Sequence, residues 1–406
     1  MAVENDYFIP FSKEEYDRRY RMLREAMKEK GLDCLLIYGT QSYGGTDLGQ
    51  INTMYLACYA AMIHCYVVLP LKGDPTLVIS VPYHLENAKD LSVIQDVRAS
   101  GFDPEIGVGQ RLKELGLEKG NIGIVGPTWT WFNYTIPVEH HNYLTKMFPK
   151  INFQTVSSWF EQLRLVKSEE EIKFLERAGV MAGLAYEEII LATKPGVRYS
   201  DLSKIGEAVA ARLGGRTPFP GHVGSTSMRN PTRAYPEFYP SHRTVNAGDL
   251  VQTETVVGYG GYFSKIYGAY FVGEPTKEYR DLFELAASVH DTAIKELKPG
   301  MTGRDAKRYV QPIKEAGYTT RDPLVLGWST MNQPPQAGAL DGSPASALEK
   351  PSDLDFVFRP GICVCILAWV VTPDMKKGIW VGSPCVFTKD GIKEFIPFPV
   401  SKMRIV

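Results

Sequence analysis

The sequence predicts an α+β protein with two domains, an N-terminal α/β domain over residues 1–155 and a pseudo-symmetric α+β domain over residues 156–406. In the first part, short apolar runs alternate with helical patterns, which is typical of a sheet covered by helices. In the second part, a Lys-Pro-Gly turn between two helices occurs at 194–196 and again at 298–300. Such a repeat indicates two similar halves.

The N-terminal domain is expected to begin with an amphipathic helix over residues 12–31. Ser12 is its N-cap, Glu15 follows three positions later, and Gly31 ends it. The apolar runs that follow predict buried strands at 32–38, 64–70, 76–81 and 121–126, with a helix at 106–116.

The second domain opens with a capping box, in which Ser168 and Glu171 start a helix that reaches about residue 192. Residues 333–355 are rich in Pro, Gly, Ala and Ser and predict an irregular loop. Further helices are expected at 199–213 and 302–316, and closing strands at 362–371, 378–388 and 393–398.

Residues 248–275 predict a β-hairpin, because two runs of β-branched and aromatic residues flank a Gly-Tyr-Gly-Gly turn. The hairpin places Glu254 on its first strand and Lys265 on its second, where the two side chains can face each other. One interpretation is an ordinary cross-strand ion pair, which contributes little stability when it is exposed. The other is a pair of site residues.

Composition excludes several classes of function. The net charge is −1 without a basic cluster, which argues against nucleic-acid and membrane-surface binding. No apolar run approaches the roughly 20 residues of a membrane span, and the first residues lack a signal-peptide pattern. The six cysteines lie in strand-like runs, which predicts reduced thiols and a cytoplasmic protein. Cys363 and Cys365 lack a second pair or a nearby His for zinc.

Several motifs, in their order and spacing, resemble the creatinase/aminopeptidase P family over nearly the whole chain. The catalytic domain of that family is called the pita-bread fold. The motifs are the 163–168 segment with Glu171, the two Lys-Pro-Gly turns, Gly-Asp at 248–249, Gly-Tyr-Phe-Ser-Lys at 261–265, Phe-Val-Gly-Glu-Pro at 271–275, Arg-Pro-Gly at 359–361 and Phe-Thr-Lys-Asp-Gly at 387–391.

Metallopeptidases of that family hold two metal ions with two Asp, one His and two Glu. By spacing, these positions fall on Glu254, Lys265, Trp328, Leu367 and Gly382, or on Ser383 with a one-residue slip. An ammonium cannot bind a cation, and it needs an anion such as Glu254 beside it. The resemblance therefore predicts no metal and no other cofactor, and it favours the metal-free branch that contains creatinase and ectoine hydrolase.

The resemblance implies a metal-independent hydrolase that acts, as a cytoplasmic homodimer, on a non-peptide C–N bond of a small guanidino, amidine or amide compound. One alternative is a lyase or another non-hydrolytic enzyme, because a fold does not fix the reaction; dimethylsulfoniopropionate lyases share this scaffold. A second alternative is a catalytically silent homologue of Xaa-Pro peptidases that binds a small molecule or a partner.

A metal-free hydrolase needs a general base. Creatinase has a His upstream of its Gly-Asp pair, and counting back by the same spacing gives Glu237 here. The loop is longer in this chain, so His222 and His242 are also candidates, although His222 could be an ordinary core or loop histidine. Glu254 could bind a guanidinium or amidinium, and Lys265 could bind a carboxylate or act as a base.

The remaining candidates are residues for substrate binding. Trp328 could stack on a planar or cationic ligand, or it could fill the space left by the metals. Tyr262 and Tyr267 could donate hydrogen bonds or pack as walls, and Cys365 is either buried packing or a nucleophile. In creatinase-like dimers the partner's N-terminal domain completes the site, which here implies contacts from Tyr59 and His64.

Overall fold

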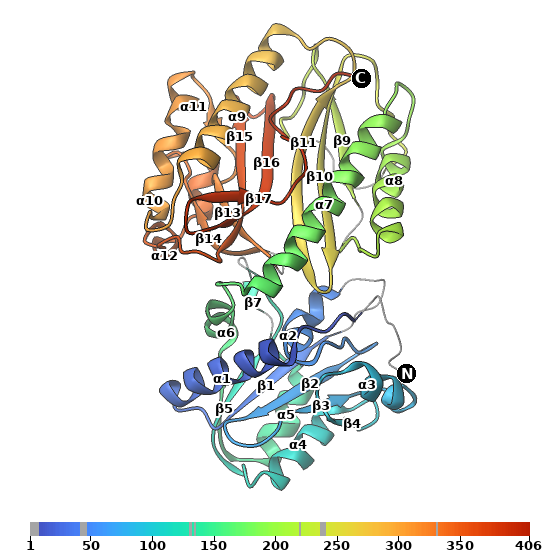
Figure 1. The fold of residues 1–406 in the computed structure, drawn as a ribbon, viewed down its shortest axis with the longest axis vertical. Coiled ribbons are helices and arrows are strands. Elements are labelled where there is room, and N and C mark those ends of the chain that lie inside the picture. Colours follow the sequence, from blue (N-terminus) through green and yellow to red (C-terminus); the bar gives the residue numbers. More distant parts are fainter. Residues whose placement is uncertain are drawn as a thin grey trace. The chain divides into compact units, whose positions relative to one another are not determined.

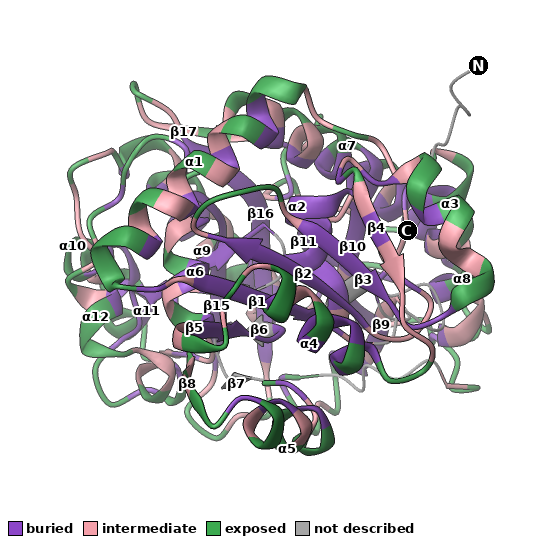
Figure 2. Cartoon of the chain, turned by 90° about the horizontal axis from the view of Figure 1, so that it is seen from below, coloured by how far each residue is buried: buried purple, intermediate pink, exposed green. Residues whose placement is uncertain are grey.

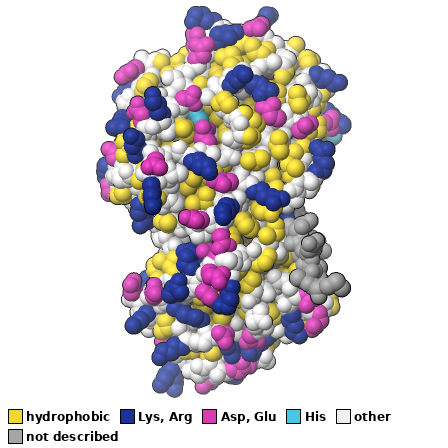
Figure 3. Space-filling model, viewed as in Figure 1, with side chains coloured by type: hydrophobic (Ala, Val, Ile, Leu, Met, Phe, Trp, Pro, Cys, Tyr) yellow, Lys and Arg dark blue, Asp and Glu magenta, His cyan; other side chains and the backbone are white. Residues whose placement is uncertain are grey.

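The computed structural model describes residues 8–40, 47–129, 132–133, 135–218, 221–235, 241–329 and 332–406 (Figure 1). The chain divides into two compact units, Met1–Arg164 and Leu165–Val406. Among the described residues, no helix has both the length and the apolar character needed to cross a membrane. On the face drawn in Figure 3, Lys and Arg are interspersed with Asp and Glu, as the near-zero net charge suggests.

The first unit is built on a six-stranded sheet of order β4-β3-β2-β1-β5-β8. Its central strand β1 (Cys34–Gly39) is antiparallel to β2 (Cys65–Pro70) and parallel to β5 (Lys119–Val125). The outer strands are β3 (Thr76–Ile79), β4 (Asp96–Ala99) and β8 (Lys150–Thr155). The short pair β6 (Thr128–Trp129) and β7 (Phe132–Asn133) forms a separate ribbon.

Helix α1 (Lys13–Lys30) confirms the first predicted element and both of its caps. Ser12 Oγ accepts from the Glu15 backbone N–H, and Gly31 ends the helix at φ 69° in the left-handed region that favours glycine. The other helices of this unit are α2 (Ile51–Ala57), α3 (Leu85–Leu91), α4 (Pro104–Glu114), α5 (Val138–Met147) and α6 (Ser157–Leu163), with 3-10 turns η1 (Asp47–Gln50) and η2 (Pro82–His84).

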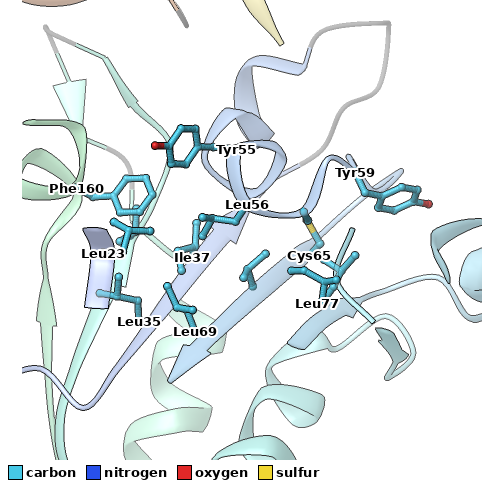
Figure 4. Packing of buried hydrophobic residues seen from close by; sticks show 14 of the residues in the cluster. Leu23, Leu35, Ile37, Tyr55, Leu56, Tyr59, Cys65, Leu69, Leu77 and Phe160 are labelled. Atoms are coloured by element: carbon cyan, nitrogen blue, oxygen red, sulfur yellow. The ribbon is translucent and has the colours of Figure 1, made fainter. Parts of the chain in front are cut away.

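Two apolar cores lie on opposite faces of this sheet, because side chains alternate along each strand. Leu35 and Ile37 pack with Leu56 and Phe160 in one core (Figure 4), whereas Leu36 packs in the other. Figure 2 shows central strands such as β1 and β2 buried along their length, while helices such as α1 and α4 expose their outer sides.

The second unit is built on a nine-stranded sheet, in which β14-β13-β15-β16-β11-β10-β9 form a continuous path. Two long hairpins occupy its centre. One is β10 (Asp249–Tyr259) with β11 (Tyr262–Phe271), and the other is β15 (Cys363–Val371) with β16 (Gly378–Phe387). The remaining strands are β9 (His222–Ser227), β12 (Thr319–Thr320), β13 (Val325–Trp328), β14 (Asn332–Ala337) and β17 (Ile392–Glu394).

Each central hairpin is covered by one long helix, which supports the prediction of two similar halves. Helix α7 (Glu169–Ala192) packs on the first hairpin, where a Cβ at Gly268 would overlap the ring of Tyr186. Helix α9 (Lys277–Glu296) packs on the second, where His290 Nε2 lies 2.9 Å from Ser383 Oγ. The predicted capping box at the start of α7 is present, and α8 (Tyr199–Arg212) follows the first Lys-Pro-Gly turn.

Two local predictions were wrong. The helix expected at 302–316 is broken into α10 (Gly303–Ala306), η3 (Lys307–Val310) and α11 (Gln311–Glu315), and Pro312 lies at the last break, where it cannot donate a backbone hydrogen bond. The irregular loop expected at 333–355 contains β14, η4 (Pro344–Leu348) and α12 (Pro351–Leu354). The prolines of β14 are tolerated because it is an edge strand.

Candidate active site

The first central hairpin has one face under α7 and an opposite face that carries the charged pair. Strands β10 and β11 pair Glu254 with Tyr267 and Val256 with Lys265, so Glu254 and Lys265 are diagonal neighbours on one face rather than directly opposite. Ser264, one residue away, donates instead to the Leu175 carbonyl oxygen of α7. Period-two alternation thus separates a face that packs on the helix from a face that carries polar groups.

Glu254 and Lys265 form a buried ion pair, not a surface one. Lys265 Nζ donates to Glu254 Oε1 at 2.7 Å, and the two side chains are only 4% and 13% exposed. Removing two charges from water is costly unless they are paired and hydrogen-bonded. The sequence interpretation of an incidental exposed salt bridge therefore does not apply.

His222 lies on the other side of the same carboxylate. It begins β9, where the register places it opposite Glu254, and its Nδ1 is 3.3 Å from Glu254 Oε2. Burial alone would raise the pKa of Glu254, but the charges and hydrogen bonds of Lys265 and His222 lower that pKa to about 2. Glu254 is therefore ionised at any physiological pH and can orient the imidazole.

Two aromatic rings contact the Lys265 ammonium. Lys265 Nζ lies 3.8 Å from the ring centroid of Trp328 and 4.6 Å from that of Tyr267. Trp328 is 3% exposed and ends β13. Desolvated cation–π contacts of this kind stabilise a positive charge, so the site holds the ammonium both with the carboxylate and with two ring faces.

Asp322, in the segment before β13, is a second carboxyl group whose pKa is influenced by the charges of Glu254 and Lys265. Burial raises the pKa of Asp322 to about 6; the nearby charges of Arg321 and Lys265 oppose the shift, and that of Glu254 adds to it. Arg321 Nη1 lies 3.5 Å from Asp322 Oδ1. Asp322 can therefore carry a proton under mildly acidic conditions, while Glu254 cannot.

This raised pKa predicts how stability depends on pH. The native state binds the Asp322 proton more tightly than the unfolded chain does, so protonation of Asp322 stabilises the fold. This contribution is fully present below the pKa of an aspartate in the unfolded chain, and it is lost as the pH rises through about 6. Relative to Asp322→Asn, the wild type should lose roughly 2–3 kcal/mol of unfolding free energy between about pH 4 and pH 8. Urea unfolding of both proteins at the two pH values measures it, and a difference that does not change with pH would contradict it.

The five positions that correspond to the family's metal ligands converge in this structure. Glu254, Lys265 and Trp328 are in contact, Leu367 pairs with Gly382, and Gly382 pairs with Tyr267. The one-residue slip does not apply, because Ser383 bonds to His290 on the face under α9.

These residues do not fit a dinuclear metal centre. Hard or borderline divalent ions need carboxylate or imidazole ligands, and Lys265, Trp328, Leu367 and Gly382 provide none. Across the described part of the chain, no group of three His, Cys, Asp or Glu side chains is arranged to hold a metal ion.

The structure places the other predicted residues as follows. Tyr267 lies in the site. Cys365 is fully buried with Sγ 3.8 Å from the Lys265 carbonyl oxygen, and burial raises its pKa to about 12, so it is a packed thiol rather than a thiolate. Tyr262 donates to Glu171 Oε1 at 2.7 Å and ties the hairpin to α7. His242 is exposed.

The described structure leaves three predicted site residues untested. Glu237 lies outside the described residues. Tyr59 and His64 belong to the first unit, where Tyr59 packs on Phe8 and His64 Nδ1 lies 2.7 Å from the Tyr38 hydroxyl. Their contribution to a partner's site remains a prediction.

Sequence reasoning missed Asp322 and Gln252. Gln252 could have been found, since it lies two residues before Glu254 and so shares its strand face. Asp322 is in a turn with no motif, and only the fold brings it near Lys265.

Comparison with known proteins agrees with this architecture. The model of metallopeptidase family M24 matches residues 173–382, just over half of the chain, and the creatinase/prolidase N-terminal domain matches residues 19–166. A solved Xaa-Pro dipeptidase from Bacillus anthracis superposes with a TM-score of 0.77 at 22% identity, covering 96% of this chain and 100% of that one. The predicted two-domain fold is confirmed.

Two relatives bear on the substrate. An Xaa-Pro dipeptidase of Lactobacillus helveticus is 27% identical over 278 residues, covering 66% of this chain and 70% of its own. A creatinase from a Bacillus species is 22% identical over 387 residues, covering 91% of this chain and 86% of its own.

The prediction of a non-peptide C–N substrate is therefore wrong, because Xaa-Pro dipeptidases recur among the relatives and the solved structures, whereas the creatinase aligns at lower identity. Neither relative is named as a lyase or as a protein without catalytic activity, so the two alternatives gain no support from the comparison. The motifs, the fold and the matched models agree that this chain belongs to metallopeptidase family M24, with a creatinase/prolidase N-terminal domain.

Proposed function

We propose that this protein hydrolyses the peptide bond of a short, dipeptide-sized substrate with the Glu254 cluster in place of a dinuclear metal centre. The observation that carries the proposal is the buried Lys265 ammonium, which is held 2.7 Å from Glu254 at a position where family members have a metal ligand. The similarity to Xaa-Pro dipeptidases supports a peptide as substrate. The ligand chemistry of the site supports metal independence.

His222 is the general base in this proposal. Its Nδ1 faces the ionised Glu254 at 3.3 Å, and in this proposal the other ring nitrogen, Nε2, accepts the proton of the attacking water. The side chain is 24% exposed, which gives water access to the ring. A carboxylate that orients a neutral imidazole and stabilises its protonated form is an established arrangement for this task.

Lys265 stabilises the oxyanion. It has three N–H donors, and one is donated to Glu254. The negative charge that develops on the carbonyl oxygen is therefore opposed by a fixed ammonium at a site shielded from water, where such interactions are strong.

Asp322 supplies the proton to the leaving amine. Its pKa of about 6 is the value that lets a carboxyl group donate near neutral pH, whereas the pKa of Glu254, at about 2, does not. Glu254 is thus ionised, whereas Asp322, on which the charges of Lys265 and Glu254 act, is able to carry a proton.

A hydrolysis assay tests the proposal. Purified protein is incubated with the dipeptides Ala-Pro and Ala-Ala, and released amino acid is quantified. We expect hydrolysis of at least one dipeptide, with a rate that falls as Asp322 ionises above about pH 6. The absence of amino-acid release from both, under conditions in which the protein is folded, overturns the proposal.

Two further predictions concern the protein's surroundings. A cytoplasmic location is supported by the six cysteines, which are all unpaired and buried. A homodimer is suggested only by the resemblance to creatinase-like enzymes, and sedimentation equilibrium of the full chain would test it.

A further inference from the structure

We infer that Gln252 is a substrate-recognition residue that binds an amide group of the peptide, an inference that rests on the function proposed above. The Gln252 side chain is fully buried, yet neither its Oε1 nor its Nε2 has a hydrogen-bond partner in the part of the chain that the structure describes. Nearly all buried polar groups in folded proteins are paired. A carboxamide that is unpaired at both ends therefore points to a bound group that pairs with it.

The location of Gln252 connects it to the reacting centre. It lies two residues before Glu254 on β10, so the two side chains project from the same face, about 7 Å apart along the strand. Its neighbours in register are Gly224 on β9 and Ala269 on β11. Both are small, so no long side chain from either neighbouring strand crowds the carboxamide.

A second unpaired group lies beside the Lys265 ammonium. The indole Nε1 of Trp328 is also buried without a partner among the described residues, while its ring contacts Lys265 Nζ. Gln252, on the strand of Glu254, and Trp328, in contact with Lys265, therefore contribute three unsatisfied polar atoms. The donors and acceptors of these atoms indicate the ligand, because a carboxamide can donate one hydrogen bond and accept another at the same time. It matches the N–H and C=O of a secondary amide, and the indole matches a further oxygen.

The experiment compares Gln252→Met with the wild type in the full chain. Methionine keeps the length of the side chain and removes its polar atoms. Because an unpaired buried carboxamide is destabilising, we expect the ligand-free variant to unfold at a temperature roughly 2–4 °C higher. The same change should weaken binding of Ala-Ala roughly 10- to 100-fold by calorimetry. Ala-Pro lacks an N–H at its peptide bond and should lose less.

A matched control is Thr253→Val, which changes the next residue on the opposite face of β10. Thr253 is fully buried, and its hydroxyl is 3.4 Å from that of Thr255. Removing this paired group should lower the unfolding temperature and leave dipeptide binding unchanged. Gln252→Met and Thr253→Val thus have expected effects of opposite sign on stability.

Each outcome decides a different claim. A lower unfolding temperature for Gln252→Met, or unchanged affinity for a dipeptide that the wild type binds, overturns the inference and leaves the proposed function standing. Dipeptide binding that depends on Gln252, without cleavage, overturns the proposed function and keeps the inference. No dipeptide binding by the wild type overturns both.

Discussion

Lys265→Met is expected to destabilise the protein by about 3–5 kcal/mol and to abolish dipeptide hydrolysis, because the Glu254 carboxylate would remain buried without its ammonium partner. Two losses coincide in this variant. The ion pair that holds Glu254 is broken, and the positive charge that opposes the oxyanion is removed. Urea unfolding and initial rates of amino-acid release measure the two effects separately.

The chain offers a matched control for this variant. Lys377 and Glu278 form an ion pair of the same 2.7 Å length, but their side chains are 31% and 43% exposed. Because exposed pairs contribute little, Lys377→Met should change the free energy of unfolding far less than Lys265→Met and should leave turnover unchanged. Equal stability losses at Lys265 and Lys377 would contradict the burial argument.

A double variant separates folding from chemistry. Lys265→Met combined with Glu254→Gln leaves no unpaired charge, so much of the lost stability should return. Turnover should not return, because neither the ammonium nor the orienting carboxylate is present. Recovery of hydrolysis in the double variant would exclude the pair from the mechanism.

His222→Gln should reduce kcat by about 10²- to 10⁴-fold, the usual contribution of a general base. The side chain is partly exposed and its bond to Glu254 is 3.3 Å long, so the effect on folding should be small by comparison. Steady-state kinetics on the best dipeptide measures it. A kcat within a few-fold of the wild type would remove His222 from the mechanism.

Two companion variants sharpen that test. His222→Ala should be rescued in part by free imidazole, which replaces a missing base but does not repair a packing defect. His242→Gln should leave kcat unchanged, because His242 is exposed, whereas His222 is the histidine that contacts Glu254. A large loss at His242 would instead favour the other sequence candidate.

Local sequence signals accounted for much of the fold. The caps at Ser12 and Gly31 and the capping box at Ser168 gave helix ends that agree with the structure to within a residue or so, because capping chemistry is confined to a few adjacent residues. The central hairpin followed from its turn and its β-branched runs. The loop prediction for residues 333–355 failed because proline normally signals a loop. Only the sheet order shows that β14 is an edge strand, where proline is tolerated.

The site was predicted only in part. Spacing placed Glu254 and Lys265 together, but their diagonal register and their burial depend on neighbouring strands. The low pKa of Glu254 comes from Lys265 and His222, which are distant in sequence, and the raised pKa of Asp322 comes chiefly from its burial, which only the fold provides. From the sequence, Gln252 is only one residue of a central strand. The structure adds that its carboxamide has no partner among the described residues.

In the proposed mechanism, the buried Lys265–Glu254 pair takes the catalytic place of the metal ions that other family members hold. Metal content and turnover, measured on the same sample after dialysis against a strong chelator, test it most directly. We predict far less than one metal ion per chain, together with an undiminished rate of dipeptide hydrolysis. Two tightly bound ions per chain, or a rate lost on chelation and restored by added manganese or zinc, would contradict it.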